Sequence, residues 1–397
     1  MNVFVIVFDS VGIGAAPDAA AYGDAGAATL PNCAAAVGGL DLPTLQAMGL
    51  GNIPAILPGG LPIAGVPPTE TPTASWGALQ ELSQGKDTTT GHWEIAGLLI
   101  EQGFHVFPPD YPSFPEDLIA AFTARTGRDI LGNRAASGTA IIEALGAEHQ
   151  QSGAWIVYTS ADSVIQIAAH EAIIPLEELY AGCRVMRKLC DPLRVGRVIA
   201  RPFVGSGPGR FKRTPNRRDF SLIPPEPLIL DHLQAHGIRT VTVGKLDDVF
   251  AHRGIDHSEH VTNNQAAQDV VLAMAAQDET QFVFVNLIDF DMLYGHRRDP
   301  KGYAAALENS DAFLAELLPR LGPDDCVMIT ADHGNDPTFR GTDHTREYVP
   351  LLLYRPGTPG LPLGIRHGFF DIAQTVATLF NVPPMPRGLS VITPNVA

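Results

Sequence analysis

The sequence predicts an α/β fold in which a mostly parallel β-sheet is flanked by helices and the chain is interrupted by an inserted domain. Three observations support this prediction. Short, nearly continuous hydrophobic runs alternate with amphipathic helical patterns, polar residues follow several of these runs directly, and the middle of the chain differs in composition from both flanks. A length of 397 residues leaves room for two or three domains.

Six hydrophobic runs have the length and the β-branched content of strands. Because they hardly alternate with polar residues, they predict strands buried on both faces, as in a parallel sheet covered by helices. The runs span residues 3–8, 154–159, 240–243, 282–288, 327–330 and 349–354.

Helical patterns lie between these runs. The segment 263–277 follows Thr262 or Asn263 as a start signal, 303–321 is amphipathic, and 371–382 starts at Asp371 and stops before Pro383. Alternation of strands and helices is typical of a mostly parallel sheet with helical crossovers.

The region 101–220 is rich in Pro and Gly and has strand-like runs of its own at 154–159 and 195–204. We therefore predict a core domain formed by 1–100 and 221–397 and an inserted α+β domain at 101–220. The Pro-rich stretch "SLIPPEP" at 221–227 is suited to a hinge.

Composition narrows the class of protein. A formal net charge of −16 disfavours nucleic acid as a general partner. No apolar run reaches the roughly 18 residues of a membrane span, and the N-terminus reads as a strand because it lacks the basic region of a signal peptide. Four cysteines without CxxC spacing predict a reducing, cytoplasmic location and argue against a thiolate zinc site.

Positive charge is concentrated in one segment of the middle region. Residues 184–218 hold eleven Lys and Arg against a single acid, Asp191. The segments "YTSADS" (158–163), "ARPFVG" (200–205) and "RTPNRRDF" (213–220) combine hydroxyls, arginines and stiffening prolines, which suit phosphate binding. A solvated basic surface is the alternative interpretation.

Polar residues follow the predicted strands where each strand ends. Asp9 comes after 3–8, Asp289 and Asp291 follow 282–288, and Asp332 with His333 follows 327–330. Lys245 similarly follows 240–243. Because ligands of open α/β sheets bind outside the carboxyl ends of strands, these distant residues are expected to converge.

The converging acids and histidines predict a metal centre. Any one of them could be a helix cap, a turn acid or a core histidine, but three carboxylates with three imidazoles suit Mn²⁺ or Zn²⁺ better than Ca²⁺ or Mg²⁺. Six ligands are enough for a two-metal site of the kind used in phosphoryl transfer. Asp289, Asp336 and Asp343 are expected to be turn or supporting residues. The six candidate ligands are Asp9, Asp291, His296, Asp332, His333 and His344.

The segment "GKDTTTGHWEIAG" at 85–97 runs from a polar loop into a helical pattern, with Asp87 placed as an N-cap. A hydroxyl at a helix N-terminus lies among backbone N–H donors that favour a phosphoryl group, and a nearby metal would activate it as a nucleophile. The alternative is that the three threonines are ordinary capping residues.

Four segments together resemble the phosphopentomutase family, of the bacterial metal-dependent type, in the alkaline phosphatase superfamily. They are "FDSVGIG", "GKDTTTGHWE", "VNLIDFDMLYGHRRD" and "TADHGNDPTFRGTDHTRE", and the similarity extends to "YTSADSVIQIAAHE" and "IARPFVG" in the insert. The resemblance covers essentially the whole chain. It implies an alkaline-phosphatase-like core, with the insert acting as a cap that grips phosphate and excludes water.

The resemblance also implies roles for individual residues. The nucleophile lies three residues before the Gly-His pair, which selects Thr88 over Thr89 and Thr90, and it is carried as phosphothreonine. Arg197, Arg213 and Arg218 are alternatives to the implied substrate arginines. The resemblance implies one Mn²⁺ on Asp9, Asp332 and His333, a second on Asp291, His296 and His344, and substrate contacts from Ser160, Asp162, Arg201, Arg217 and Lys245.

The expected reaction is therefore the interconversion of ribose or 2-deoxyribose 1-phosphate and 5-phosphate by an isomerase, through the phosphothreonine and a pentose 1,5-bisphosphate. Zn²⁺ or Mg²⁺ would be substitutes for Mn²⁺, and a sugar bisphosphate would be the activator that phosphorylates the threonine. A phosphatase or phosphoglycerate mutase of the same superfamily is the alternative, while a non-catalytic binding module leaves the threonine loop without a role. The expected partners are small pentose phosphates, and the oligomeric state stays open, a monomer included.

Overall fold

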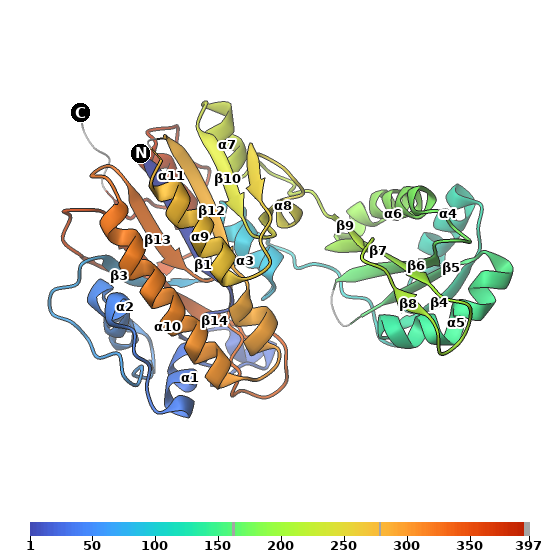
Figure 1. Cartoon of the computed structure of the whole chain (residues 1–397), viewed down its shortest axis with the longest axis horizontal. Helices are drawn as coiled ribbons and strands as arrows, with labels where there is room; N and C mark the ends of the chain where they lie inside the picture. The colour runs from blue at the N-terminus through green and yellow to red at the C-terminus, as the bar shows by residue number, and fades with distance from the viewer. Residues whose placement is uncertain (161–162, 278, 393–397) are drawn as a thin grey trace. The chain divides into compact units, whose positions relative to one another are not determined.

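The computed structural model describes residues 1–160, 163–277 and 279–392 and divides the chain into two compact units (Figure 1). Unit 1 consists of Met1–Gln102 and Pro224–Ala397, and unit 2 is the intervening Gly103–Ile223. The boundaries fall close to the expected ones at 100 and 220. None of the described helices combines the length and the apolar composition that a membrane span requires.

Unit 1 is built on a nine-stranded sheet in the order β11-β10-β12-β1-β13-β14-β3-β15, with the short β2 paired to β14. The five strands from β11 to β13 run parallel, and β14 is antiparallel to both of its neighbours. The strands are β1 (Asn2–Phe8), β2 (Gly14–Ala15), β3 (Ser75–Gln80), β10 (Arg239–Val243), β11 (His257–Glu259), β12 (Gln281–Leu287), β13 (Cys326–Thr330), β14 (Glu347–Tyr354) and β15 (Pro362–His367).

Helices cover this sheet on both faces, since every residue of β1, β12 and β13 is buried. The helices α1, α2 and α9 pack against α10, and α9 and α10 lie in front of the sheet in Figure 1, whereas α3 and α7 pack against α11. The helices of unit 1 are α1 (Thr29–Val37), α2 (Pro43–Met48), α3 (Thr88–Ile95), α7 (Ile229–Ala235), α8 (Leu246–Val249), α9 (Asn264–Ala275), α10 (Pro300–Leu317) and α11 (Asp371–Leu379).

The predicted α/β class with a mostly parallel sheet is confirmed, and the six predicted strands match β1, β5, β10, β12, β13 and β14. The predicted helix start near Asn263 is also found, because its side chain accepts a hydrogen bond from the Ala266 amide at 2.9 Å. The helical pattern predicted after the polar loop in 85–97 is found as α3, which stops at Ile95. Gly97, with φ of 102°, turns the chain away in a conformation that L-residues avoid.

Unit 2 has its own six-stranded mixed sheet, in the order β4-β5-β6-β7-β8, with β9 paired to β7. Successive residues of β5 point to opposite faces: Trp155 and Val157 pack in one apolar cluster, and Ile156 and Tyr158 in another. Unit 2 therefore has a hydrophobic core of its own. Its elements are β4 (Ile130–Ala135), β5 (Trp155–Thr159), β6 (Val164–His170), β7 (Arg197–Val204), β8 (Lys212–Arg213), β9 (Arg218–Ser221), α4 (Glu116–Thr126), α5 (Gly138–Ser152) and α6 (Leu176–Cys190).

Candidate metal centre and active site

The candidate metal centre lies at the carboxyl ends of three adjacent parallel strands of unit 1. Asp9 follows β1, Asp332 and His333 follow β13, and Asp291 lies in the single π-helical turn 290–295 that comes after β12. Such turns are frequent at functional sites. The sheet order β12-β1-β13 thus brings together residues that are more than 300 positions apart in the sequence.

The first group of ligands is Asp9, Asp332 and His333, whose ligand atoms lie within 4.8 Å of one another. His333 Nε2 is 3.6 Å from Asp9 Oδ1 and 3.2 Å from Asp332 Oδ2. All three side chains are buried. This is the set that the family resemblance implies for one metal.

The second group is Asp291, His333 and His344, also within 4.8 Å, so His333 belongs to both groups. His344 Nε2 lies 3.5 Å from Asp291 Oδ1, and His296 Nε2 lies 3.1 Å from Asp291 Oδ2. His296 is held by its other nitrogen, since Nδ1 is 2.6 Å from the carbonyl of Thr342. Five of the six expected ligands therefore lie in these two groups, with His333 in both. His296, which was expected in the second group, contacts Asp291 but belongs to neither group.

The electrostatics of the centre favour a cation. Burial, together with the Asp332 and Asp291 charges, raises the pKa of the Asp9 carboxyl well above its ordinary value. Burial acts to lower the pKa of His333, but the Asp332, Asp9 and Asp291 carboxylates together outweigh burial and raise that pKa well above its ordinary value. Because the Asp9, Asp332 and Asp291 carboxylates lie close together in a buried site, positive charge is favoured there.

The donor set fits divalent metal ions. Asp9 Oδ1, Asp332 Oδ2 and His344 Nε2 are buried atoms that lack a partner in hydrogen-bonding geometry among the described residues. Buried polar atoms are normally satisfied, so atoms of this kind that converge on one point suit a metal. Three carboxylates and three imidazoles suit Mn²⁺ or Zn²⁺.

Thr88 is the first residue of α3 and lies beside this centre. Its Oγ1 is 3.3 Å from His333 Nε2. Asp87 is the N-cap predicted from sequence, because its carboxylate accepts from the Thr90 amide at 3.1 Å and from the Thr90 hydroxyl at 2.6 Å. The Thr90 hydroxyl is thus engaged in capping, whereas the Thr88 hydroxyl is directed at the metal ligands.

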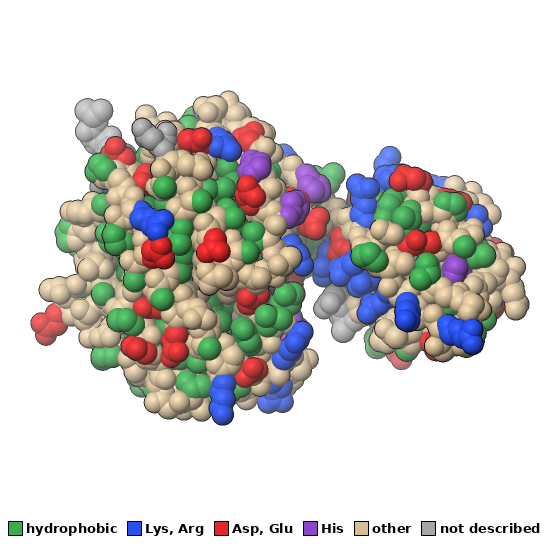
Figure 2. All heavy atoms as spheres, viewed as in Figure 1, with side chains coloured by type: hydrophobic (Ala, Val, Ile, Leu, Met, Phe, Trp, Pro, Cys, Tyr) green, Lys and Arg blue, Asp and Glu red, His purple; other side chains and the backbone are tan. Residues whose placement is uncertain are grey.

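Two of the expected phosphate-binding residues of unit 2, Ser160 and Arg201, lie close to each other. Gln166 links two of them, since its Oε1 accepts from Arg201 Nε at 2.8 Å and its Nε2 donates to Ser160 Oγ at 3.4 Å. Arg217 forms two 2.7 Å hydrogen bonds with Asp219. Figure 2 shows Lys and Arg side chains gathered over β7, β8 and β9 of this unit. The expected contact Asp162 lies outside the described residues.

Lys245 and a third acid–histidine cluster of unit 1 belong to neither group of ligands. Lys245, the expected substrate lysine of unit 1, is exposed at the N-cap of α8. Asp247, Asp248 and His252 form a third cluster of potential ligands in the described part of the chain, but Asp248 and His252 are exposed and none of the three belongs to the two groups above.

Known proteins that are similar to this chain identify its family. The model of the Metalloenzyme superfamily matches residues 1–384. The chain is 53% identical over 382 residues to the phosphopentomutase of Anaeromyxobacter sp. (strain K), covering 96% of each chain, and 47% identical over 391 residues to that of Alkaliphilus oremlandii, covering 98% of this chain and 97% of the relative. The chain belongs to the phosphopentomutase family.

A solved structure agrees with this family at the level of the fold. The crystal structure of Leishmania mexicana phosphoglycerate mutase at low cobalt concentration superposes with a TM-score of 0.52 at 13% identity, covering 99% of this chain and 98% of that one. The alkaline-phosphatase-like core expected from the sequence is thus confirmed together with family membership.

Residues that support the ligands were missed by the sequence analysis. Asn286 donates to Asp9 Oδ2 at 2.8 Å, and Asn335 donates to Asp291 Oδ1 at 2.7 Å. His92, fully buried in α3, places Nδ1 3.1 Å from Asp332 Oδ2 and 2.8 Å from the Thr88 carbonyl. Asn286 carried a readable signal, because it is a polar residue inside the otherwise apolar run 282–288.

The three acids expected to have supporting roles do so. Asp289 accepts from the Asn264 amide at 2.9 Å at the start of α9. Asp336 accepts from Asn32 Nδ2 at 2.6 Å, and Asp343 pairs with Lys86 at 3.1 Å. These acids hold loops together around the centre.

Gly91 lets α3 pack directly on the backbone of a ligand. A Cβ atom at this position would lie 2.1 Å from the Asp332 carbonyl oxygen, a contact that requires the helix to shift. Gly→Ala normally stabilises a helix by about 1 kcal/mol, but overpacking of this kind costs roughly 1–3 kcal/mol. We expect Gly91→Ala to lower both the urea midpoint and Mn²⁺ affinity. Gly182→Ala in α6, where the nearest atoms are 3.2 Å away in the Trp155 ring, is the matched control, and an equal response of both variants would contradict the prediction.

Glu347 joins the segment that carries His344 to the start of the chain. Its carboxylate accepts from the Thr29 hydroxyl at 2.6 Å, the Thr29 amide at 2.9 Å, the Thr345 hydroxyl at 2.7 Å and the Gly14 amide at 3.2 Å. Burial raises the pKa of this carboxyl from 4.5 to about 7. The protonated form is therefore favoured in the folded protein.

This shift predicts a pH dependence of stability. A raised pKa contributes stability that is fully present below pH 4.5 and is lost as pH rises through about 7, which amounts to roughly 3 kcal/mol. In metal-free protein, we expect the unfolding free energy of wild type to fall over this window relative to that of Glu347→Gln, which cannot titrate. Urea titrations from pH 4.5 to 7.5 measure the difference, and parallel pH profiles of the two proteins would rule the prediction out.

Proposed function

We propose that this chain catalyses the phosphopentomutase reaction, the interconversion of ribose or 2-deoxyribose 1-phosphate and 5-phosphate, through a phosphothreonine at Thr88. Family membership supports the reaction, since the relatives named phosphopentomutase match over 96% of this chain. The observation that carries the route is the position of Thr88: its hydroxyl lies 3.3 Å from His333, the residue that belongs to both groups of metal ligands.

We propose that two Mn²⁺ ions bind here, one on Asp9, Asp332 and His333 and the other on Asp291, His296 and His344, with Zn²⁺ or Mg²⁺ as substitutes. When bound, such ions neutralise charge on the transferred phosphoryl group and lower the pKa of a neighbouring hydroxyl. The buried atoms without hydrogen-bond partners support a metal at each group, because Asp9 and Asp332 belong to the first and His344 to the second.

The chain's own residues position the attacking hydroxyl and surround the phosphoryl group with hydrogen-bond donors. Thr88 Oγ loses its proton and bonds to the phosphorus of a pentose bisphosphate, while the bond from phosphorus to the sugar oxygen breaks. The sugar oxygen takes up a proton and leaves as the pentose monophosphate, and the phosphoryl group is now on Thr88. Return of that group to the other oxygen of a pentose monophosphate completes the exchange. The first turn of α3 directs free backbone N–H groups toward a phosphoryl group at its first residue. Asp87 keeps that turn in place through its bonds to Thr90.

We propose that Ser160, Asp162, Arg201, Arg217 and Lys245 contact the pentose phosphate. Arg201 lies close enough to Arg217 for the second guanidinium to lower the pKa of the first, in addition to the effect of burial. Two cations held together in this way attract an anion with more than one charge, which suits a phosphate dianion. Gln166 adds a link between Arg201 and Ser160.

Three further parts of the proposal concern the working protein. A sugar bisphosphate is the activator that loads Thr88, and small pentose phosphates are the partners. The protein works in the cytoplasm, which the four free, buried cysteines support. A monomer is compatible with a site whose metal ligands all come from one chain.

The test is phosphopeptide mapping of the purified protein combined with turnover of ribose 5-phosphate. We expect a phosphate on the 85–97 peptide at Thr88 that exchanges with labelled pentose bisphosphate, together with formation of ribose 1-phosphate. Release of free phosphate instead of the isomeric sugar phosphate would point to a phosphatase. A phosphate on Thr89 or Thr90, or none during turnover, would overturn the proposed route.

A further inference from the structure

Arg346 is a fully buried cation next to the metal centre that has no part in the proposed ligand set. Its side chain is 2% exposed, and it follows the expected ligand His344 by two residues. Removing a guanidinium from water is costly unless its donors are matched by acceptors. The identity of those acceptors therefore shows what the residue holds in place.

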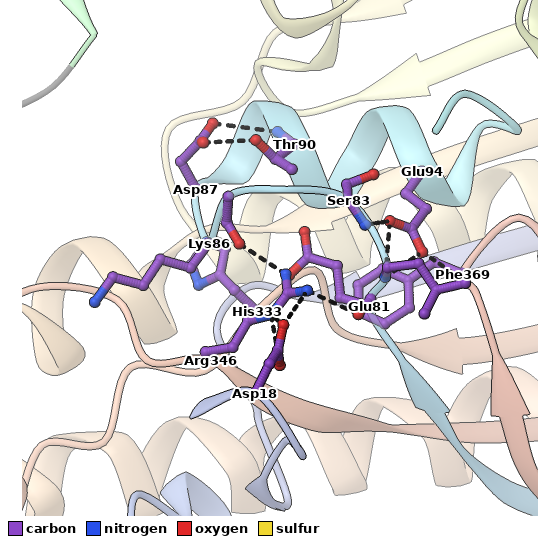
Figure 3. A network of polar contacts seen from close by, with 12 residues as sticks. Asp18, Glu81, Ser83, Lys86, Asp87, Thr90, Glu94, His333, Arg346 and Phe369 are labelled. Atoms are coloured by element: carbon purple, nitrogen blue, oxygen red, sulfur yellow. Dashed lines mark hydrogen bonds and ion pairs between the residues drawn. The ribbon is translucent and has the colours of Figure 1, made fainter. Parts of the chain in front are cut away.

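The guanidinium bonds two carboxylates and two backbone carbonyls. Nη2 donates to the Glu81 carbonyl at 2.8 Å, Nη1 donates to the Gly85 carbonyl at 2.7 Å, and Nη1 lies 2.5 Å from the Glu81 carboxylate. Nε and Nη2 donate to Asp18 at 3.2 and 3.0 Å. Figure 3 shows Arg346 between the side chains of Asp18 and Glu81. A planar fork of five N–H donors suits this set, and a lysine could not reach all of it.

The two carbonyls belong to the segment that leads into Thr88. Gly85 precedes Thr88 by three residues, and Glu81 is the first residue after β3. A short path of bonds therefore runs from His344 through Arg346 to Gly85 and on to Thr88. The nucleophile loop, defined here as residues 81–87, is tied to the segment that carries a metal ligand.

A second contact reinforces the same tie. Lys86 Nζ lies 3.1 Å from Asp24 Oδ2 and 3.1 Å from Asp343 Oδ2. Asp24 Oδ2 also accepts from the Arg346 backbone amide at 3.0 Å. The nucleophile loop is thus held to residues 343–346 on both sides of Gly85, through Glu81 on one side and Lys86 on the other.

The loop itself is compact, so a shift at one end is transmitted to the other. Asp87 bonds both the amide and the hydroxyl of Thr90, and Thr90 packs against Gly85, where an added Cβ would lie 2.5 Å from its hydroxyl oxygen. The carbonyls that Arg346 holds therefore set where α3 begins, and with it the position of the Thr88 hydroxyl.

We infer that Arg346 is a positioning residue for phosphoryl transfer: it holds the nucleophile loop so that Thr88 keeps its place beside His333. This inference rests on the proposed function. A buried ion pair is often no more stabilising than apolar residues of similar size, so stability alone does not account for a guanidinium here. Positioning does, because phosphoryl transfer depends on placement and a 1 Å displacement can cost about 100-fold in rate.

The test uses two variants of Arg346. The first is Arg346→Lys, and the second carries both Arg346→Met and Glu81→Gln, so that no lone buried charge remains. Arg366→Met is the matched control. Arg366 also joins a carboxylate (Asp371, 2.7 Å) and a carbonyl (Leu389, 3.3 Å), but both of these partners lie outside the nucleophile loop. The measurements are Mn²⁺ content, kcat and KM for ribose 5-phosphate, and the rate at which a pentose bisphosphate phosphorylates the 85–97 peptide.

We expect both Arg346 variants to retain two Mn²⁺ and a KM within about threefold of wild type, while kcat and the phosphorylation rate fall about 100-fold in the double variant and less in Arg346→Lys. The control should match wild type. Unchanged kcat in the double variant, or loss of metal in parallel with activity in both variants, would overturn the positioning role. Failure of the proposed function is recognised separately, because wild type itself would then carry no phosphate on Thr88.

Discussion

Thr88→Ala is expected to abolish mutase turnover while leaving the metal centre occupied. Removal of a covalent nucleophile alone can reduce kcat on the order of 10⁶-fold. A similar loss is expected here because the phosphoryl group no longer has an acceptor on the protein. Thr88 contributes no carboxylate or imidazole to either group of ligands, so metal content should stay at two per chain. Coupled turnover of ribose 5-phosphate and elemental analysis of the same preparation measure both quantities.

The neighbouring threonines are the controls for this prediction. Thr89→Ala should keep most of the activity. Thr90→Ala should lower stability instead, because it removes a hydroxyl that bonds the Asp87 cap at 2.6 Å, and loss of a hydrogen bond costs about 1 kcal/mol. Mutase activity in Thr88→Ala near that of wild type would mean that the covalent route through this residue is wrong.

His333→Ala is expected to have the second large effect, the loss of the metal proposed on Asp9, Asp332 and His333 and weaker binding of the second metal. His333 belongs to both groups of ligands, and its removal leaves three carboxylates with weaker compensation. Metal ions contribute several kcal/mol to stabilisation of transition-state charge, so we expect turnover to fall by about 10³-fold or more. Manganese content after gel filtration, measured beside turnover, tests this.

His296→Ala provides the internal contrast. His296 contacts Asp291 and is not in the first group, so its loss should remove no more than one Mn²⁺ per chain. His232→Ala is the outside control, because His232 is half-buried, lies 2.6 Å from the Pro383 carbonyl and belongs to neither group of ligands. If His333→Ala retained two Mn²⁺, the central place of His333 in both groups would be refuted.

Much of the fold was predictable because strong local patterns agree with the tertiary structure. The apolar runs at 3–8, 282–288 and 327–330 became β1, β12 and β13 with shifts of one residue at most at either end, since a strand buried on both faces tolerates few polar residues. Unit 2 was harder to predict. The β4 strand has no fully buried residue, and the glycine and the positive-φ asparagine within it break the pattern on which such predictions depend.

The candidate ligands were predictable for a related reason. Asp9, Asp332 and His333 directly follow apolar strands, and the rule that sites form at the carboxyl ends of parallel strands connects them without coordinates. His92 gave no comparable signal. A single histidine in a helical segment reads as an ordinary core residue, and only its 3.1 Å approach to Asp332 distinguishes it.

The amino-acid sequence was sufficient to predict the α/β class and to single out the six acids and histidines and the threonine loop as candidates, because these features are local patterns of hydrophobicity, charge and glycine. Three-dimensional packing settled what depends on long-range contacts. It directed Thr88, and not the capping Thr90, toward His333, and it placed His333 in both groups of ligands. It also buried Arg346, which in sequence is one more charge in a polar run, against the carbonyls of Glu81 and Gly85. The physical reason is that hydrogen-bond partners more than 200 residues away leave no periodic trace in the chain.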